Sequence, residues 1–420
     1  MSRIVGIIAM LFGFILLVLS MPDHWPTWGV KVERAPIHSV QEVQIDTSDV
    51  DVHIVEEDRE DLAVTLEGNT EVKLTPQGTG LGILITRKPL SLFPCDAVAV
   101  IHLPQTYGRN ISIAANHGEV TLAGLSEQHK LGLKRLNVRV DHGELALTDV
   151  TLEDLQFAMD KGRLLIRQSS LGNSTMKIQS GKVDLNKVNG RLYTELSTGV
   201  FEADSVTSDN AELTVGKGDI SLSQFTGDWN ASLSAGHMIV KGGSGGKGVV
   251  TIDKGDFNLA SFKGKLETTI NKGNMNISDF SGDFKSSIIN GNFNAQRMMA
   301  GEGVIDAGNG KINISDYTGG LQADLQKGQI NIGLKEAVKA IEVKAASGDI
   351  TFGLPPNGDF TIDASAVKGM VDNGSRLSNT GGAGNNKTLH AISGQGVVPI
   401  RLNSNDGDIH IHSKGGSDSR

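Results

Sequence analysis

The chain has little of what small rigid folds and metal centres depend on. It carries one cysteine, Cys95, among 420 residues, which excludes an intramolecular disulfide and a zinc site built from cysteines. We expect Cys95 to be a small buried hydrophobe. Hydrophobic residues make up 38% of the chain and aromatic residues 5%, which fits a fold with a narrow core.

A basic surface is also lacking. The formal net charge is −9, and no stripe of lysine and arginine with interleaved aromatic residues is present. Such a stripe is what neutralises phosphate groups, so the composition excludes nucleic acid as a partner.

Helical patterns are scarce. Beyond the N-terminus, the stretch 334–340 is the one candidate for a short helix, and strand-like alternation dominates elsewhere. The 52 glycines follow no three-residue period, which excludes a collagen-like chain. The sequence therefore predicts an all-β protein.

What the chain does have is a glycine every 18 or 19 residues, each of which opens the same short strand pattern. A fixed period of this kind is typical of stacked repeats. The series is Gly162, Gly181, Gly199, Gly218, Gly236, Gly255, Gly273, Gly291, Gly310 and Gly328.

Apolar residues follow each glycine at the second, fourth and seventh positions, with mostly polar residues between them. Alternation with a period of two indicates a half-buried strand. The second position holds Val183, Phe201, Ile220, Met238, Phe257, Met275, Phe293, Ile312 and Ile330; the fourth holds Leu185, Ala203, Leu222, Val240, Leu259, Ile277, Ala295, Ile314 and Ile332; the seventh holds Val188, Val206, Phe225, Phe262, Phe280, Met298 and Tyr317.

A second glycine often follows the seventh position by two residues, at Gly190, Gly227, Gly264, Gly282 and Gly319. We interpret the pair as an aromatic corner followed by a turn, because glycine accepts positive φ. A second alternating strand then returns. No single unit can bury its own apolar face, so neighbouring units must stack. The prediction is a single-chain β-solenoid of 18–19-residue rungs; an antiparallel sandwich, the competing architecture, would not need identical spacing.

A row of asparagines supports the solenoid. It occupies the third position after the glycine in five consecutive units, at Asn258, Asn276, Asn294, Asn313 and Asn331. Like side chains stacked from rung to rung can bond as an asparagine ladder. The alternative is that asparagine is merely tolerated on a wet strand face.

The N-terminus carries an apolar run over residues 4–21, IVGIIAMLFGFILLVLSM, preceded by Arg3 and followed by Pro22, Trp25 and Trp28. The run has about the length that spans a bilayer, and the aromatic residues suit the membrane interface. A cleaved signal peptide is the rival interpretation, but no small-residue cleavage site follows. We expect a single-pass membrane protein with the bulk of the chain outside the cytoplasm.

The chain divides into four predicted parts. They are a membrane anchor with its interface at 1–30, an N-terminal β segment that caps the solenoid at 31–115, the repeat β-solenoid at 116–352, and C-terminal rungs with a polar insertion and tail at 353–420.

The repeat and its flanks resemble the DUF4097 family, a bacterial family labelled as adhesins and related to auto-transporter adhesin head domains. The matching pieces are SDVDVHIVEED at 48–58, His102-Leu103-Pro104, the units GEVTL, GDISL and GDITF, and the closing NDGDIHI. The resemblance covers residues 40–412. It implies a β-solenoid-like fold with a surface or envelope role, and it brings no catalytic residues.

Acidic and histidine pairs are the first candidates for chemistry. Asp219 and Asp256 share the position after the glycine, with His237 between them; we interpret the two aspartates as turn residues rather than a catalytic pair. His410 and His412 alternate on one strand, but two ligands without a third favour a solvated terminal strand over a metal site. His117 and His142 precede matching glycines, and we expect their rings to stack.

Three glycine-rich segments are the other candidates. GGSGGKG at 242–248 lacks the spacing of a phosphate loop and predicts a flexible solenoid loop. NSNDGD at 403–408 resembles part of a calcium loop without its final glutamate. The polar stretch 372–389 is either a partner-facing loop or a disordered excursion.

We therefore predict no enzyme, and no catalytic, cofactor-binding or metal-binding residues. The leading hypothesis is a membrane-anchored extracytoplasmic β-solenoid that acts as a surface binding, adhesin-like or cell-envelope structural module. The expected partners are a cell-wall polymer or a surface protein, together with the membrane. The alternatives are a self-assembling solenoid scaffold and a polysaccharide-active β-helix enzyme.

Overall fold

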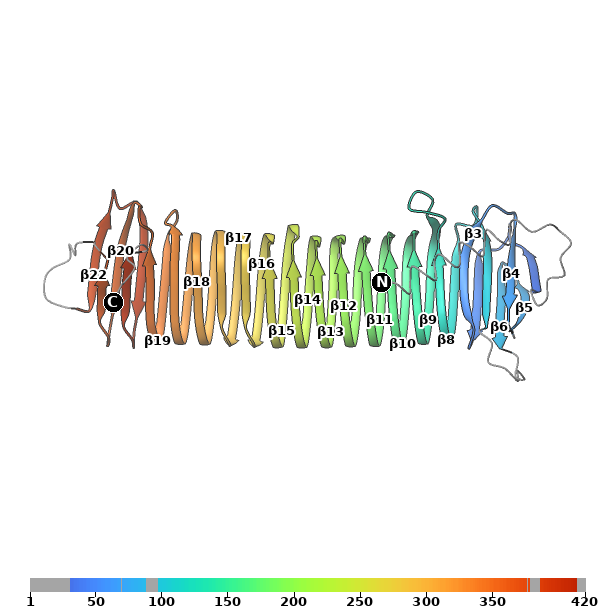
Figure 1. The fold of residues 1–420 in the computed structure, drawn as a ribbon, viewed down its shortest axis with the longest axis horizontal. Coiled ribbons are helices and arrows are strands. Elements are labelled where there is room, and N and C mark those ends of the chain that lie inside the picture. The colour runs from blue at the N-terminus through green and yellow to red at the C-terminus, as the bar shows by residue number, and fades with distance from the viewer. Residues whose placement is uncertain (1–30, 69, 88–96, 376, 378–385, 414–420) are drawn as a thin grey trace.

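The computed structural model describes residues 31–68, 70–87, 97–375, 377 and 386–413. The regular secondary structure in these ranges consists of β-strands alone. The strands form one long solenoid-like stack, with the N-terminal strands at one end and the C-terminal strands at the other (Figure 1). No helix in the described part of the chain is long and apolar enough to cross a membrane. The predicted anchor at 4–21 and Cys95 lie outside the described residues.

The strands are β1 (Lys31–Pro36), β2 (Glu42–Ser48), β3 (Asp51–Glu57), β4 (Asp61–Glu67), β5 (Thr70–Gln77), β6 (Gly80–Arg87), β7 (Val98–Pro104), β8 (Asn110–Ala123), β9 (Leu131–Thr148), β10 (Val150–Arg167), β11 (Ser170–Asn186), β12 (Asn189–Asp204), β13 (Thr207–Ser223), β14 (Thr226–Lys241), β15 (Ser244–Ala260), β16 (Lys263–Lys272), β17 (Met275–Asn290), β18 (Phe293–Glu336), β19 (Ile341–Leu354), β20 (Phe360–Ala366), β21 (Val371–Gly374), β22 (Thr388–Ser393), β23 (Val398–Ser404) and β24 (Ile409–Ser413).

The candidate helix at 334–340 does not form. β18 continues through Glu336, and a short connection leads to Ile341 at the start of β19. Leu334 and Ile341 are fully buried as members of the same core that runs through the stack. Burial of these two side chains in the core outweighs the weak local helix pattern between them.

Consecutive rungs pair in parallel, like residue on like residue. Gly162 lies opposite Gly181, and Leu164 lies opposite Val183. Each rung consists of a short strand that begins at the glycine, a tight turn, and a longer return strand to the next glycine. The predicted all-β rungs of 18–19 residues are what the structure contains.

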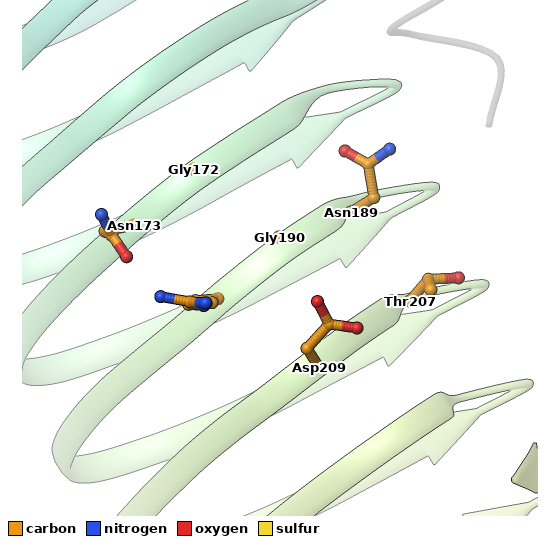
Figure 2. Close-up of a pocket in the computed structure, with 7 residues that line it drawn as sticks. Gly172, Asn173, Asn189, Gly190, Thr207 and Asp209 are labelled. Carbon is orange, nitrogen blue, oxygen red and sulfur yellow. The ribbon is translucent and has the colours of Figure 1, made fainter. Parts of the chain in front are cut away.

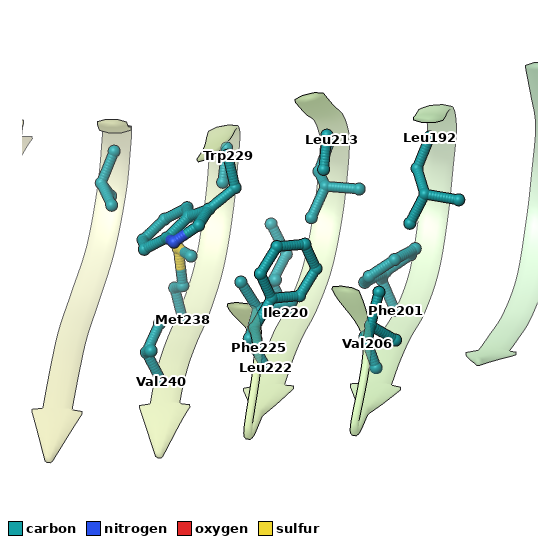
Figure 3. Packing of buried hydrophobic residues seen from close by; sticks show 14 of the residues in the cluster. Leu192, Phe201, Val206, Leu213, Ile220, Leu222, Phe225, Trp229, Met238 and Val240 are labelled. Carbon is teal, nitrogen blue, oxygen red and sulfur yellow. The ribbon is translucent and has the colours of Figure 1, made fainter. Parts of the chain in front are cut away.

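The core lies between the short strands and the return strands. All the residues predicted for the second, fourth and seventh positions are buried, with at most 6% of any side chain exposed, at Ala295. Figure 3 shows the second position as a continuous column through Phe201, Ile220 and Met238, which pair from rung to rung. The predicted core is therefore confirmed.

The corner glycine is required for two physical reasons. Its φ lies between +139° and +154° in the predicted series, a region that side-chain-bearing residues rarely adopt. In addition, a Cβ placed on Gly273 would lie 1.7 Å from the carbonyl oxygen of Gly255 in the preceding rung. Neighbouring rungs thus come so close at the corner that only glycine fits.

The second turn of each rung differs from the prediction. The left-handed residue sits six positions after the corner glycine, before the buried seventh position, and its φ is between +49° and +57° where it is not glycine. The second glycines that we assigned to this turn instead lie at irregularities of strand pairing after it, as at Gly282. The row of left-handed residues is Asp149, Gln168, Lys187, Ser205, Gln224, Gly242, Ser261, Asp279, Arg297 and Asp316.

Glycines inside the core make room for large rings on adjacent rungs. A Cβ on Gly248 would lie 2.4 Å from the indole ring of Trp229, and a Cβ on Gly303 would lie 2.4 Å from the ring of Phe284. A bulky residue in one rung is therefore balanced by a missing side chain in the next, which keeps the packing dense along a narrow core.

Antiparallel strands close both ends of the stack. At the N-terminal end, β1 pairs with β4 and β5 pairs with β6, both antiparallel. At the C-terminal end, β20 and β22 are antiparallel, whereas β21 pairs in parallel with β24. The last glycine corner, Gly407, stacks on Gly348 although 59 residues separate them, because the segment between forms this end hairpin.

The corner predicts a sharp contrast between two glycine substitutions. Gly273→Ala combines a positive φ with backbone overlap, so we expect the free energy of unfolding to fall by about 3 kcal/mol or more. Gly333→Ala is the control, because its nearest neighbour would be 3.8 Å away and its φ is not positive. Urea unfolding followed by circular dichroism measures both; equal midpoints for the two variants would contradict the corner argument.

Candidate binding surface

One surface of the stack is built from amides and hydroxyls. It lies on the short strands of the rungs that begin at Gly255, Gly273, Gly291, Gly310 and Gly328. We call it the carboxamide face and define it by Asn258, Asn276, Asn294, Asn313 and Asn331 in the third position after the glycine, and Ser278, Gln296 and Ser315 in the fifth. Most of these residues line a shallow open groove of about 580 Å³.

The asparagines of this face form a continuous ladder. The Nδ2 group of each donates to Oδ1 of the asparagine one rung earlier, at 2.8 Å from Asn276 to Asn258, 3.0 Å from Asn294 to Asn276, 2.9 Å from Asn313 to Asn294 and 2.8 Å from Asn331 to Asn313. The predicted asparagine ladder is confirmed. Register places identical side chains one rung apart, and each amide has both a donor and an acceptor to share.

A second polar row runs beside the corner glycines. The sequence did not lead us to predict its hydrogen bonds from rung to rung. Oδ1 of Asp256 accepts the backbone N–H of Asn274 at 2.7 Å, and Oδ1 of Asn274 accepts the backbone N–H of Asn292 at 3.1 Å. Asp219 does the same for His237 at 3.0 Å. These side chains hold the next rung rather than their own turn. The available signal was the recurrence of Asp and Asn directly after the glycine.

Charge is distributed unevenly over the stack. On the same side, but nearer the N-terminal end, Lys182 pairs with Glu202 at 2.6 Å. On the return strands, Lys247 pairs with Glu267 at 2.7 Å. The third and fifth positions of the carboxamide face carry no charged residue. The uncharged stretch is therefore a local feature of these rungs.

A second groove, of about 440 Å³, lies where the return strands begin in earlier rungs. Figure 2 shows Asn173, Asn189 and Asp209 around it, with Gly172 and Gly190 on its floor. A Cβ on Gly190 would lie 1.6 Å from the carbonyl oxygen of Leu171, so this floor is bare backbone. Arg191 also lines it, which makes this groove charged where the carboxamide face is not.

Two histidines stack at the N-terminal end of the corner row. The ring centroids of His117 and His142 are 5.1 Å apart and the rings are 9° from parallel, as expected from their matching positions. Across the glycine row, partial desolvation and repulsion from Glu144 and Asp51 raise the pKa of Glu119. This corner therefore gathers acidic groups that repel one another once ionised.

The remaining candidates take structural positions. His410 and His412 are exposed on β24, and Nδ1 of His410 lies 3.4 Å from Asp372. In the described ranges, no group of three His, Cys, Asp or Glu residues is placed to hold a metal ion.

The glycine-rich segments are also accounted for by the stack. The flexible loop predicted at GGSGGKG is wrong: Gly242 and Gly243 form the tight turn, and residues 244–248 are the first residues of β15. NSNDGD contains the last corner, where the Asp408 N–H donates to Asp349. Much of the polar stretch 372–389 lies outside the described residues.

The ladder predicts a graded loss of stability. Asn294 takes part in two amide–amide bonds, and Asn331 takes part in one. Asn294→Ala should therefore destabilise the chain by about 0.5–1.5 kcal/mol more than Asn331→Ala, the value of one further hydrogen bond. Chemical unfolding of the two variants tests this, and equal losses would show that the ladder contributes nothing.

The acidic corner predicts a pH-dependent gain. Because the folded-state pKa of Glu119 is raised, its ionisation opposes folding as the pH rises above the ordinary pKa of glutamate. Glu119→Gln should raise Tm at pH 7, and the gain should disappear at pH 3, where the native side chain is neutral. The same substitution at Glu153, which is exposed like Glu119 but lies on a return strand away from this acidic corner, is the control. A gain that is independent of pH would refute the electrostatic explanation.

The solved structures that this chain resembles are remote from it in sequence. They include a "putative cell adhesion protein" from Clostridium sporogenes (10% identity, 92% of this chain and 99% of that chain, TM-score 0.19). Two others are each a "putative adhesin", from Parabacteroides merdae (12%, 69% and 98%, TM-score 0.25) and Parabacteroides distasonis (11%, 72% and 99%, TM-score 0.24). Similarities this low carry no conclusion about function. No curated protein matches the chain.

The family match is broader. A family model described as Toastrack DUF4097 matches residues 40–223 and 281–412, together more than half of the chain. The unmatched stretch between them contains the corners Gly236, Gly255 and Gly273, which pair in the same register as their neighbours. This chain, with its glycine-cornered rungs, belongs to the DUF4097 Toastrack family.

Proposed function

We propose that this protein is a membrane-anchored extracytoplasmic module that binds a cell-wall polymer or a surface protein and catalyses no reaction. The observation that carries the proposal is the carboxamide face, where four side-chain hydrogen bonds hold five asparagines in a fixed row. A row of equal groups is suited to an extended partner rather than to a small substrate.

Rigidity makes such a row effective despite its shallow groove. Side chains that are already held in place lose little conformational freedom on binding. Contacts that are weak one by one then add along the row, because binding at one rung brings the next contacts to high effective concentration.

The N-terminal residues support the membrane part of the proposal. The apolar run at 4–21 follows Arg3 and ends shortly before β1 begins at Lys31. β1 belongs to the N-terminal end of the stack (Figure 1). An anchored chain would therefore keep this end near the membrane and project the C-terminal rungs away from it, over roughly 60 Å for the rungs from Gly118 to Gly348 at ~4.8 Å each.

The roles of the acidic residues support a non-catalytic protein. The carboxylates of Asp219 and Asp256, the pair considered for catalysis, accept backbone N–H groups of the following rung. Antiparallel strands lie at the N-terminal end and on one sheet at the C-terminal end, where the other sheet ends in the short parallel strand β21. This speaks against head-to-tail filaments, since a further rung would have to pair in parallel on both sheets. We therefore favour a binding function over a self-assembling scaffold and over a polysaccharide-active enzyme.

Sedimentation with purified cell walls tests the proposal. The full-length chain in detergent should co-sediment with walls, while a reporter protein fused to residues 1–30 alone should not. Protease added to intact cells should cleave the stack, as expected for a domain outside the cytoplasm. A chain that is protected in intact cells, or that sediments no better than the reporter, would refute the proposal.

A further inference from the structure

The free hydrogen-bonding groups of the carboxamide face can be counted. Within the ladder, Asn276, Asn294 and Asn313 each donate one N–H and accept one bond at Oδ1. A primary amide has two N–H groups and two lone pairs. Each of these residues therefore keeps one donor and one acceptor for a partner, and the pair repeats on these three consecutive rungs.

The charges in the two rows that flank this face are mixed in sign. In the row beside the corner, Asp256 and Lys311 have opposite signs and lie at different rungs. In the turn row, Arg297 is held by Asp279 through contacts of 2.6 and 2.8 Å, and Asp316 adds a second carboxylate one rung further. A polyanion or a polycation would thus meet no continuous row of opposite charge, yet would lose part of its hydration in the groove.

Hydroxyl groups match the amide donors and acceptors that the ladder leaves free. A hydroxyl donates one hydrogen bond and accepts others, so one sugar hydroxyl can use both free groups of an amide. The exposed large hydrophobic side chains in the described part of the chain are aliphatic: Val32, Leu84, Leu125, Ile289, Met299, Val338, Val367, Met370, Ile392 and Val397. Recognition on this face therefore depends on hydrogen bonds rather than on stacking against exposed rings.

We propose that the carboxamide face binds an uncharged polysaccharide that lies along the stack, with its hydroxyl groups bonded to the free amide groups of Asn276, Asn294 and Asn313. The inference rests on the proposed binding function and names the class of its partner. Because each rung contributes weakly, affinity should increase with the length of the glycan until the ladder is covered.

Oligosaccharide binding by the full-length chain in detergent is the direct test. Glucose and N-acetylglucosamine oligomers of increasing length are the neutral probes, and galacturonic acid oligomers of equal length are the anionic comparison. We expect Kd to fall with length for a neutral series and weak binding of the anionic series. Equal or tighter binding of the anionic oligomers would overturn the inference.

Failure of this inference is distinguishable from failure of the proposed function. A preparation that sediments with cell walls but binds neither neutral series overturns the polysaccharide assignment and leaves the binding role intact. A preparation that neither sediments with cell walls nor binds the oligomers overturns both the inference and the proposed function.

Variants outside the ladder show whether this face is the site. Gln296 and Ser315 line the groove and are exposed. Gln296→Glu combined with Ser315→Asp adds two carboxylates without removing a ladder bond and should weaken binding of the neutral oligomers at least fivefold. Gln326→Glu, on an exposed return-strand position, is the matched control and should leave Kd unchanged.

Two further measurements complete the experiment. Equal Tm values for the variants and the native chain show that the fold is intact; if the double variant unfolds, Gln296→Glu alone replaces it. Equal effects of the groove and control variants would overturn the site. A dimer that forms with concentration and is lost in the groove variant would show instead that a second copy of this chain occupies the face.

Discussion

The close approach of successive rungs at the glycine corner is the constraint on which the rest of this structure depends. From Gly143 to Gly348, a Cβ at each corner would lie 1.7–1.9 Å from the carbonyl oxygen of the glycine before it. Glycine must therefore stack on glycine, and the register of all other residues follows from that match. A slip by one residue would place a side chain in the overlap and turn the core side chains outward.

Fixed register converts sequence repetition into spatial rows. The apolar rows become one continuous core, and the polar rows become ladders whose members bond to their own kind. The asparagine ladder and the aspartate–asparagine row beside the corner arise from the same geometry, but one uses side-chain amides and the other uses backbone N–H groups of the next rung. The polar rows on the outer surface thus follow the same register as the core.

Function on such a scaffold depends on where the rows change composition. Charged pairs such as Lys182 with Glu202 give way to uncharged amides toward the C-terminal rungs, while backbone pairing continues in the same way. The fold therefore does not dictate the ligand. The side chains of consecutive rungs determine what the surface presents, and neighbouring rungs can vary without loss of register, because stability in a stack is largely a matter of nearest neighbours.

The sequence by itself determined the rungs, the three buried positions and the asparagine row, because each repeats with the period of the corner glycine. The tertiary structure decided what the period does not encode. It moved the tight turn to residues such as Asp279, since a polar residue with positive φ leaves no strong sequence signal. It placed strand and connection at 334–340, the one stretch with a weak helical pattern, because Leu334 and Ile341 both belong to the core. It also brought Gly407 onto Gly348, a contact that depends on how the intervening segment folds back rather than on any local pattern.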